Sequence, residues 1–85
     1  MVSGKIVIVN QTGLNVKSAG ALVKLIQPYN SEVTLNHKNK QFNAKSVLGI
    51  ISACIQSGEE VEFVCEGSDE VSCLHAIEKA LRAGL

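Results

Sequence analysis

Residues 13–20 read Gly-Leu-Asn-Val-Lys-Ser-Ala-Gly, and residues 43–49 read Asn-Ala-Lys-Ser-Val-Leu-Gly. Each stretch has the form of a turn followed by a helix start, with a polar residue, Asn15 or Ser46, at the expected N-cap. A helix N-terminus presents free backbone N–H groups and a partial positive charge, and both suit a phosphate. These two turns therefore guide the prediction of the fold and of the functional site.

The composition predicts one small globular domain over residues 1–85. The hydrophobic share is 46%, which is ordinary for a soluble protein and sufficient for a modest single core. No apolar run approaches the roughly 20 residues of a membrane span, and the apolar stretch near the N-terminus is too short for a signal peptide. We therefore expect a cytoplasmic protein without membrane insertion.

The cysteines favour a structural role. Cys54, Cys65 and Cys73 are odd in number, form no C-x-x-C pair and do not fall at zinc-ligand spacing with His37 or His75. We expect all three to be small core residues. No metal site and no cofactor is predicted.

The first half of the chain predicts a β-α-β-β order. Residues Lys5–Val9 are apolar and β-branched, as in a buried strand. Residues Val16–Gln27 carry apolar side chains at helical spacing, and a proline follows them. Residues Glu32–Leu35 and Lys40–Asn43 alternate polar and apolar side chains, with a hairpin expected over residues 36–39.

The second half predicts an α-β-α order. An apolar helix is expected over Val47–Ile55 and a strand over Glu60–Cys65. Ser68 or Asp69 is the expected N-cap of a last helix. The apolar stripe of that helix is predicted to consist of Val71, Leu74, Ile77 and Leu81. The order βαββαβα favours an α+β two-layer sandwich, with an antiparallel sheet and helices on one face.

The net charge is zero, but the charges are sorted along the chain. Residues 1–58 hold six lysines against one glutamate, whereas residues 59–85 hold two cations against seven acids. Four of the lysines could share one face of the fold: Lys17, Lys24, Lys40 and Lys45. Such a face would attract an acidic partner, although a plain solvated surface remains an alternative. Nucleic acid is a weaker interpretation, because the chain has no arginine cluster.

The motifs resemble those of HPr, the histidine-containing phosphocarrier family of the bacterial sugar phosphotransferase system. The resemblance rests on residues 12–14 (Thr-Gly-Leu), on residues 43–46 before an apolar helix with Gly49, and on residues 67–70 before the last helix. It extends from Lys5 to about Leu81. It implies an open-faced sandwich, in which three helices cover one face of a four-stranded antiparallel sheet.

The active-site turn departs from the family at three positions. Family carriers read Gly-Leu-His-Ala-Arg-Pro, and the resemblance places Asn15 where they have the phosphate-carrying histidine. The nitrogen of an amide has a delocalised lone pair and cannot replace an imidazole as nucleophile. Lys17 replaces the arginine and Ser18 the proline. We expect Asn15 to be an N-cap, and Asn15, Val16 and Lys17 to form an anion- or partner-binding turn without a catalytic residue.

The two histidines offer no obvious replacement for the family's carrier. Neither His37 nor His75 follows a glycine-rich turn or a helix start. We expect His37 in a solvated hairpin turn and His75 in the last helix, at the surface or half-buried.

Ser46 is the second candidate site. In the HPr family of many Gram-positive bacteria, the serine at this position is phosphorylated by HPr kinase, and the phosphoserine form binds a catabolite-control repressor. A phosphate there would face a helix N-terminus, with Lys45 adjacent and Lys40 near. Three residues of the following helix could form an exposed apolar patch for a partner: Val47, Leu48 and Ile51.

Two functions follow from the resemblance. The first is a regulatory protein controlled through Ser46, similar to the catabolite-repression HPr paralogue, which also lacks the histidine. The alternative is a phosphocarrier or binding module specialised for another permease system, with Lys17, Lys24 and Lys45 contacting the general phosphotransferase enzyme or permease domains. An enzyme is disfavoured because no base–nucleophile pair is visible. We expect a monomer or a weak dimer.

Overall fold

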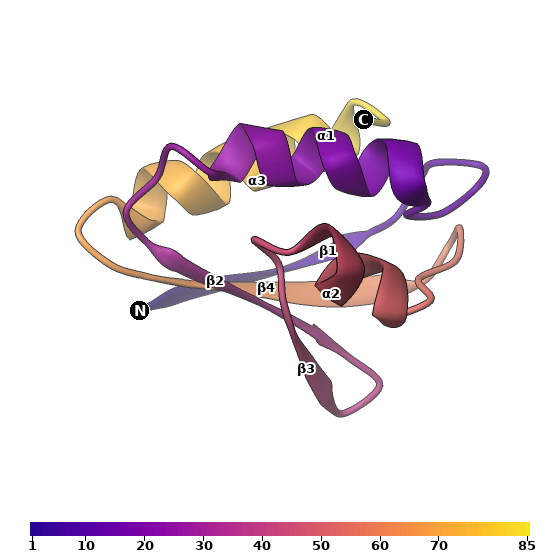
Figure 1. The fold of residues 1–85 in the computed structure, drawn as a ribbon, viewed down its shortest axis with the longest axis horizontal. Coiled ribbons are helices and arrows are strands. Elements are labelled where there is room, and N and C mark those ends of the chain that lie inside the picture. The colour runs from indigo at the N-terminus through magenta and orange to yellow at the C-terminus, as the bar shows by residue number, and fades with distance from the viewer.

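The computed structural model describes all residues, 1–85, and has two layers (Figure 1). The strands are β1 (Val2–Val7), β2 (Glu32–His37), β3 (Lys40–Asn43) and β4 (Glu60–Glu66). The helices are α1 (Val16–Ile26), α2 (Val47–Ser52) and α3 (Glu70–Arg82). All three helices lie on one side of the sheet, with α1 and α3 side by side. The predicted element order and the α+β open-faced sandwich are confirmed.

The sheet has the strand order β1-β4-β2-β3, and every pair is antiparallel. The central strand β4 pairs with β1 and β2, so that Val61 lies opposite Ile6 and Phe63 lies opposite Leu35. These side chains point toward the helices and are buried together with the inner faces of α1 and α3. Phe63 is fully buried at the centre of this single core.

The prediction of a buried strand over Lys5–Val9 is wrong in its bounds and in its burial. Strand β1 begins at Val2 and ends at Val7, and the side chains of Val7 and Val9 are 50% and 55% exposed. The cause is the one-sided cover of the sheet. Successive side chains of a strand point to opposite faces, so only every second residue reaches the helices.

The hairpin is tighter than predicted. Strand β2 continues to His37, and only Lys38 and Asn39 separate it from β3. Both residues have left-handed backbone conformations, with φ values of 51° and 63°. Two left-handed central residues match the twist of a two-residue hairpin, although Asn tolerates this conformation better than Lys does.

Helix α2 is shorter than predicted. It ends at Ser52 instead of Ile55, because Cys54 takes a left-handed conformation with φ 52°. The expectation that all three cysteines lie in the core is wrong for Cys54, which is exposed. Cys65 and Cys73 are buried as predicted, and burial raises the pKa of the Cys65 thiol to about 12.

The buried stripe of α3 differs from the predicted one at its first residue. Cys73, Ile77 and Leu81 are fully buried at a spacing of four residues, and Leu74 is half-buried beside them. Val71 is 68% exposed, so its assignment to the core stripe was wrong. An apolar residue in the first turn of a helix need not reach the sheet, because the stripe winds around the helix.

Asp69 occupies the N-cap position of α3 but binds a different segment. Its carboxylate accepts hydrogen bonds from the N–H groups of Asn30 and Ser31, at 2.8 and 3.0 Å, and from the Ser31 hydroxyl at 2.5 Å. It makes no side-chain hydrogen bond to its own helix. The Ser31 hydroxyl, followed by the Asn30 and Ser31 N–H groups, holds the pKa of Asp69 below its usual value. Asp69 therefore ties the start of β2 to the start of α3.

Two helical glycines provide a matched test of the packing between α2 and β3. A Cβ atom at Gly49 would lie 2.5 Å from the backbone oxygen of Asn43, whereas one at Gly20 would meet no atom within 4 Å. Gly49→Ala should lower the free energy of unfolding by about 1–3 kcal/mol through overpacking. Gly20→Ala should raise it by about 0.5–1 kcal/mol through helix propensity. Urea unfolding measures both, and equal effects would contradict the predicted close approach.

The Asp69 contacts predict a dependence of stability on acid. The pKa of this carboxyl is lower in the folded than in the unfolded chain, so its contribution is full near neutral pH and is lost as the pH falls through the folded pKa. Asp69→Asn should be less stable than wild type at pH 7, and the difference should shrink toward pH 3. Glu60→Gln, an exposed carboxylate without a hydrogen bond or ion pair, is the control. A constant difference across this range would contradict the assignment.

Candidate functional site

The turn before α1 rests directly on the loop that follows α2. The N–H of Leu14 donates to the carbonyl oxygen of Ile55 at 3.1 Å. A Cβ atom at Gly13 would lie 2.3 Å from the same oxygen and 2.8 Å from Cα of Gln56. Gly13 also has a left-handed φ of 67°. Only glycine fits this position, both for its conformation and for the close approach of the two backbones.

Asn15 is the N-cap of α1, as predicted, and both ends of its side-chain amide are engaged. Its Oδ1 accepts the N–H of Ser18 at 3.0 Å, and its Nδ2 donates to the Thr12 hydroxyl at 2.9 Å. The Ser18 hydroxyl in return accepts the backbone N–H of Asn15 at 2.9 Å, which completes a capping box. Sequence reasoning missed the role of Ser18, although a polar residue three positions after the N-cap was a usable signal.

The surface of this turn is partly apolar and partly cationic. Val16 is 69% exposed, and Lys17 is exposed beside it. A hollow next to the turn is lined by Asn15, Lys17 and residues of the chain's end, including Leu85. The Nδ2 of Asn10 donates to the carbonyl of Leu85 at the edge of this hollow. The turn thus offers a cation and an apolar side chain to a ligand or partner.

Ser46 is the N-cap of α2, as predicted. Its hydroxyl accepts the N–H of Gly49 at 3.2 Å, and the residue is half-buried. The adjacent Lys45 does not stand free on a cationic face, because its Nζ donates to the carbonyl oxygen of Tyr29 at 2.6 Å. Lys45 keeps its positive charge in this contact, and its predicted role in binding a partner stays a prediction.

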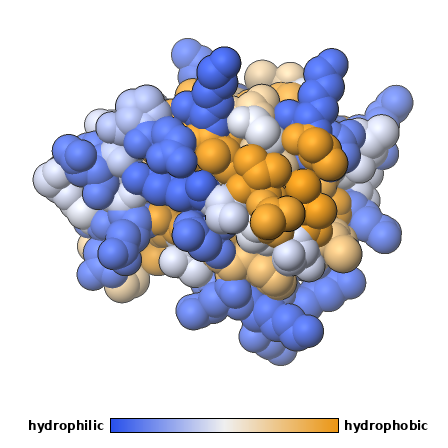
Figure 2. All heavy atoms as spheres, in the orientation of Figure 1, coloured by the Kyte–Doolittle hydropathy of each residue, from blue (hydrophilic) through white to orange (hydrophobic).

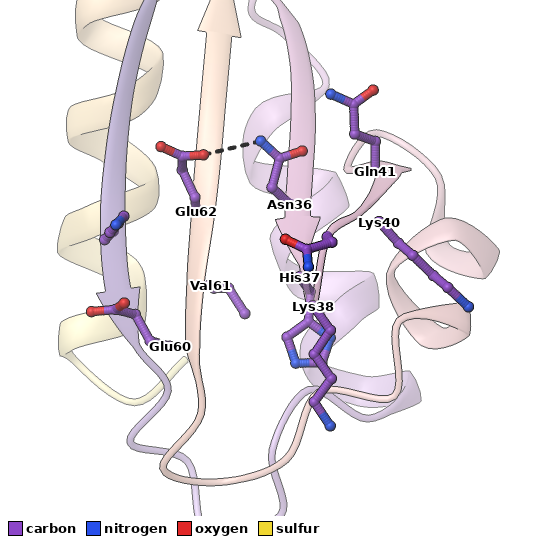
Figure 3. A pocket seen from close by; sticks show the side chains of 10 residues that line it. Asn36, His37, Lys38, Lys40, Gln41, Glu60, Val61 and Glu62 are labelled. Atoms are coloured by element: carbon purple, nitrogen blue, oxygen red, sulfur yellow. Dashed lines mark hydrogen bonds between the residues drawn. The ribbon is translucent and has the colours of Figure 1, made fainter.

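The other predicted lysines lie on different parts of the molecule. Lys24 is exposed in the last turn of α1, and Lys17 is exposed in its first turn. Lys40 opens β3 and lines a hollow at the hairpin end of the sheet together with Lys5 (Figure 3). The lysines predicted to share one face are thus divided between helix α1 and the hairpin end of the sheet.

An apolar patch, defined as Val16, Val47, Leu48 and Ile51, is carried by the neighbouring helices α1 and α2. Leu48 is 76% exposed, and Val47 and Ile51 are half-buried. Figure 2 shows hydrophobic side chains gathered around α2 and α1, with hydrophilic side chains around them. An exposed group of large apolar side chains with a polar rim is typical of a protein-binding surface.

The hollow at the hairpin end of the sheet is polar and has mixed charge. Lys5, Glu62, Asn36 and Gln41 lie at one level across the four strands on the open face. Asn36 donates to Glu62 at 3.0 Å (Figure 3). The opposite charges of this row balance each other, so the row indicates no single class of ligand. Nowhere do three or more His, Cys, Asp or Glu side chains converge to hold a metal ion.

His37 is buried, which overturns its prediction as a solvated turn residue. Its side chain points inward from the end of β2, and the residue is 6% exposed. Nε2 lies 3.2 Å from Oε2 of Glu59, at ion-pair distance but without the alignment of a hydrogen bond. The Nζ of Lys38 lies 3.2 Å from the same oxygen. The Gln56 N–H, with smaller contributions from Lys38 and His37, lowers the pKa of Glu59 to about 2.

His75 is exposed on α3, as predicted, and has no hydrogen bond or ion pair. None of the helices is both long and apolar enough to cross a membrane.

The candidate functional features of the structure lie in three places. These are the Asn15 turn, the Ser46 cap with the apolar patch, and the charged cluster around Glu59.

Comparison with known proteins gives a consistent family assignment. A family model described as "PTS HPr component phosphorylation site" matches residues 2–83. The phosphocarrier protein HPr of Treponema pallidum (strain Nichols) is 33% identical over 79 residues, which cover 93% of this chain and 90% of that protein.

Solved structures agree with this assignment. A crystal structure of HPr-C-His from Thermoanaerobacter tengcongensis superposes with a TM-score of 0.96 at 31% identity, covering 99% of this chain and 94% of that one. The Bacillus subtilis catabolite repression protein Crh, described as a domain-swapped dimer, superposes with a TM-score of 0.80 at 29% identity, covering 100% and 98%. In sequence and in fold, this chain belongs to the HPr family of the phosphotransferase system.

Proposed function

We propose that this HPr-family protein is a regulatory component of the phosphotransferase system, controlled by phosphorylation of Ser46 and not a carrier of phosphate at residue 15. The observation that carries the proposal is the state of Asn15. Its amide oxygen caps α1 by accepting the N–H of Ser18, and its amide nitrogen donates to the Thr12 hydroxyl. An amide nitrogen is also a poor phosphoryl acceptor, because its lone pair is delocalised into the carbonyl group.

Ser46 is chemically suited to receive the phosphate instead. Its hydroxyl lies at the first turn of α2 and bonds only the N–H of Gly49. A phosphate on this oxygen would face the free N–H groups of the helix start, so α2 could keep its conformation after modification. The neighbouring residue Leu48 is largely exposed, so a partner could contact the modified serine and an apolar side chain together.

The partners proposed for this surface are HPr kinase and then a catabolite-control repressor. The similarity to Crh, whose name refers to catabolite repression, supports this choice. The apolar patch would supply the buried centre of such an interface, and Lys17 and Lys24 would supply a cationic rim. We assign the protein to the cytoplasm, where these partners act, with a role as substrate and binding partner and not as an enzyme.

A second function is favoured by the family itself. The chain could be a binding module, or a phosphocarrier with another acceptor, for a different permease system. It would then contact the general phosphotransferase enzyme or a permease domain through the Asn15 turn. The exposed Val16 and Lys17 support this alternative, because they offer a contact that does not need Ser46. The similarity to Crh, described as a domain-swapped dimer, supports a weak dimer as the alternative to a monomer.

The Ser46 proposal predicts a specific phosphorylation. Incubation with ATP and HPr kinase should add one phosphate to wild type, detected by intact mass, and none to Ser46→Ala. Ser52→Ala is the matched control, because Ser52 is exposed in the same helix and its hydroxyl donates to the Leu48 carbonyl at 2.6 Å. It should be modified like wild type. Equal phosphorylation of Ser46→Ala, or no phosphorylation of wild type, would contradict the proposal.

A further inference from the structure

Glu59 lies in the loop between α2 and β4, directly before β4, and links that loop to the distant hairpin between β2 and β3. We propose that Glu59 is a positioning residue for the Asn15 turn, because its carboxylate fixes the loop on which that turn rests. The inference concerns the turn used in the proposed function, but it does not depend on phosphorylation of Ser46.

The first link runs from the hairpin to Glu59. Oε2 of Glu59 lies 3.2 Å from Nε2 of His37 and 3.2 Å from Nζ of Lys38. His37 is almost completely buried and about a quarter of the Glu59 side chain is exposed, so water screens this contact less than a surface pair, whereas the Lys38 side chain is 73% exposed. Lys38 has a left-handed backbone, which is unfavourable for a lysine, and its ion pair helps to hold that conformation.

The second link runs from Glu59 to the loop. The other carboxylate oxygen, Oε1, accepts the N–H of Gln56 at 2.8 Å, and the backbone N–H of Glu59 donates to the Gln56 carbonyl at 3.2 Å. The loop is also bonded to Ile8, which donates to the Glu59 carbonyl at 2.9 Å and accepts from Gly58 at 2.8 Å. The carboxylate therefore fixes Gln56, and Ile8, the residue after β1, fixes the adjacent Gly58 and Glu59.

The third link runs from Gln56 to the turn. Cα of Gln56 lies within 2.8 Å of the place where a Gly13 side chain would begin, and the adjacent Ile55 carbonyl accepts the Leu14 N–H. The two backbones are in close contact, so a shift of Gln56 toward the turn would displace Gly13, and a shift away from it would break the hydrogen bond between Leu14 and Ile55. Asn15, whose cap sets the first turn of α1, follows only two residues later.

This arrangement gives Glu59 a local effect on the turn, beyond its contribution to global stability. Loss of the carboxylate would free the Gln56 N–H, the His37 imidazole and the Lys38 ammonium together, and the contact between the loop and Leu14 would open more often. A glutamine at this position keeps an oxygen that can accept the Gln56 N–H but loses the charge that faces His37 and Lys38. A glutamine at residue 59 should therefore hold the loop against Leu14 better than an alanine but less well than the native glutamate.

Amide hydrogen exchange of the unphosphorylated full chain tests the proposal. The Leu14 N–H reports on the contact between the turn and the loop, and the Phe63 N–H in the central strand reports on global opening. In Glu59→Ala, the Leu14 amide should exchange about tenfold faster relative to the Phe63 amide than in wild type. In Glu59→Gln, this ratio of exchange rates should lie between the values for wild type and Glu59→Ala. Glu60→Ala, which removes the neighbouring exposed carboxylate, should leave the ratio unchanged.

The proposal is overturned if Leu14 and Phe63 accelerate by the same factor in Glu59→Ala, because the role would then be only global. It is also overturned if Glu60→Ala changes the ratio of Leu14 to Phe63 exchange rates as much as Glu59→Ala does. If Glu59→Ala does not fold, Glu59→Gln is compared with Glu60→Gln instead. The proposal is overturned if the ratio of Leu14 to Phe63 exchange rates is the same in both variants. Kinase treatment plays no part in this measurement, so its failure and the failure of the Ser46 proposal are distinguishable.

Discussion

The arrangement of the functional surface depends on the close contact between Gly13 and the peptide that joins Ile55 to Gln56. A side chain at residue 13 would begin 2.3 Å from the Ile55 carbonyl oxygen, so the two backbones touch without intervening side-chain atoms. This contact sets the entry of the chain into α1 and places the Asn15 cap beside the end of α2. The start of α1 and the loop after α2, which stand far apart in the sequence, are thereby joined, and the neighbouring helices α1 and α2 carry the apolar patch.

The element order was predictable because it depends on local patterns. Helix α1 shows a regular apolar spacing, and its boundaries agree with the prediction to within one residue. Asn15 and Ser46 were recognisable as caps, because a polar residue before an apolar helical run has few other uses. The element order already favoured an antiparallel sheet with helices on one face, and the resemblance to HPr added that three helices cover four strands.

The remaining features depend on contacts between distant residues. Nothing near His37 in the sequence indicates that it is buried, because its partner Glu59 lies on another segment. Lys45 looked like a free surface cation, but the Tyr29 carbonyl engages its ammonium group. Cys54 looked like a core residue in an apolar helix, yet its left-handed backbone ends α2 before the helix reaches it. In each case, a tertiary contact or a backbone conformation determines the environment of the side chain, and neither composition nor periodicity reports on it.

The central claim is that the turn retains the architecture of the family without the chemistry of a carrier. The most direct test is transfer from phosphoenolpyruvate through the general phosphotransferase enzyme, followed by phosphorus-31 NMR of the product. We predict no phosphoramidate signal for wild type, because the Asn15 amide is held by Ser18 and Thr12 and is not nucleophilic. An acid-labile phosphoramidate signal on the wild-type protein would contradict it and would direct attention to His37 or His75 as the acceptor.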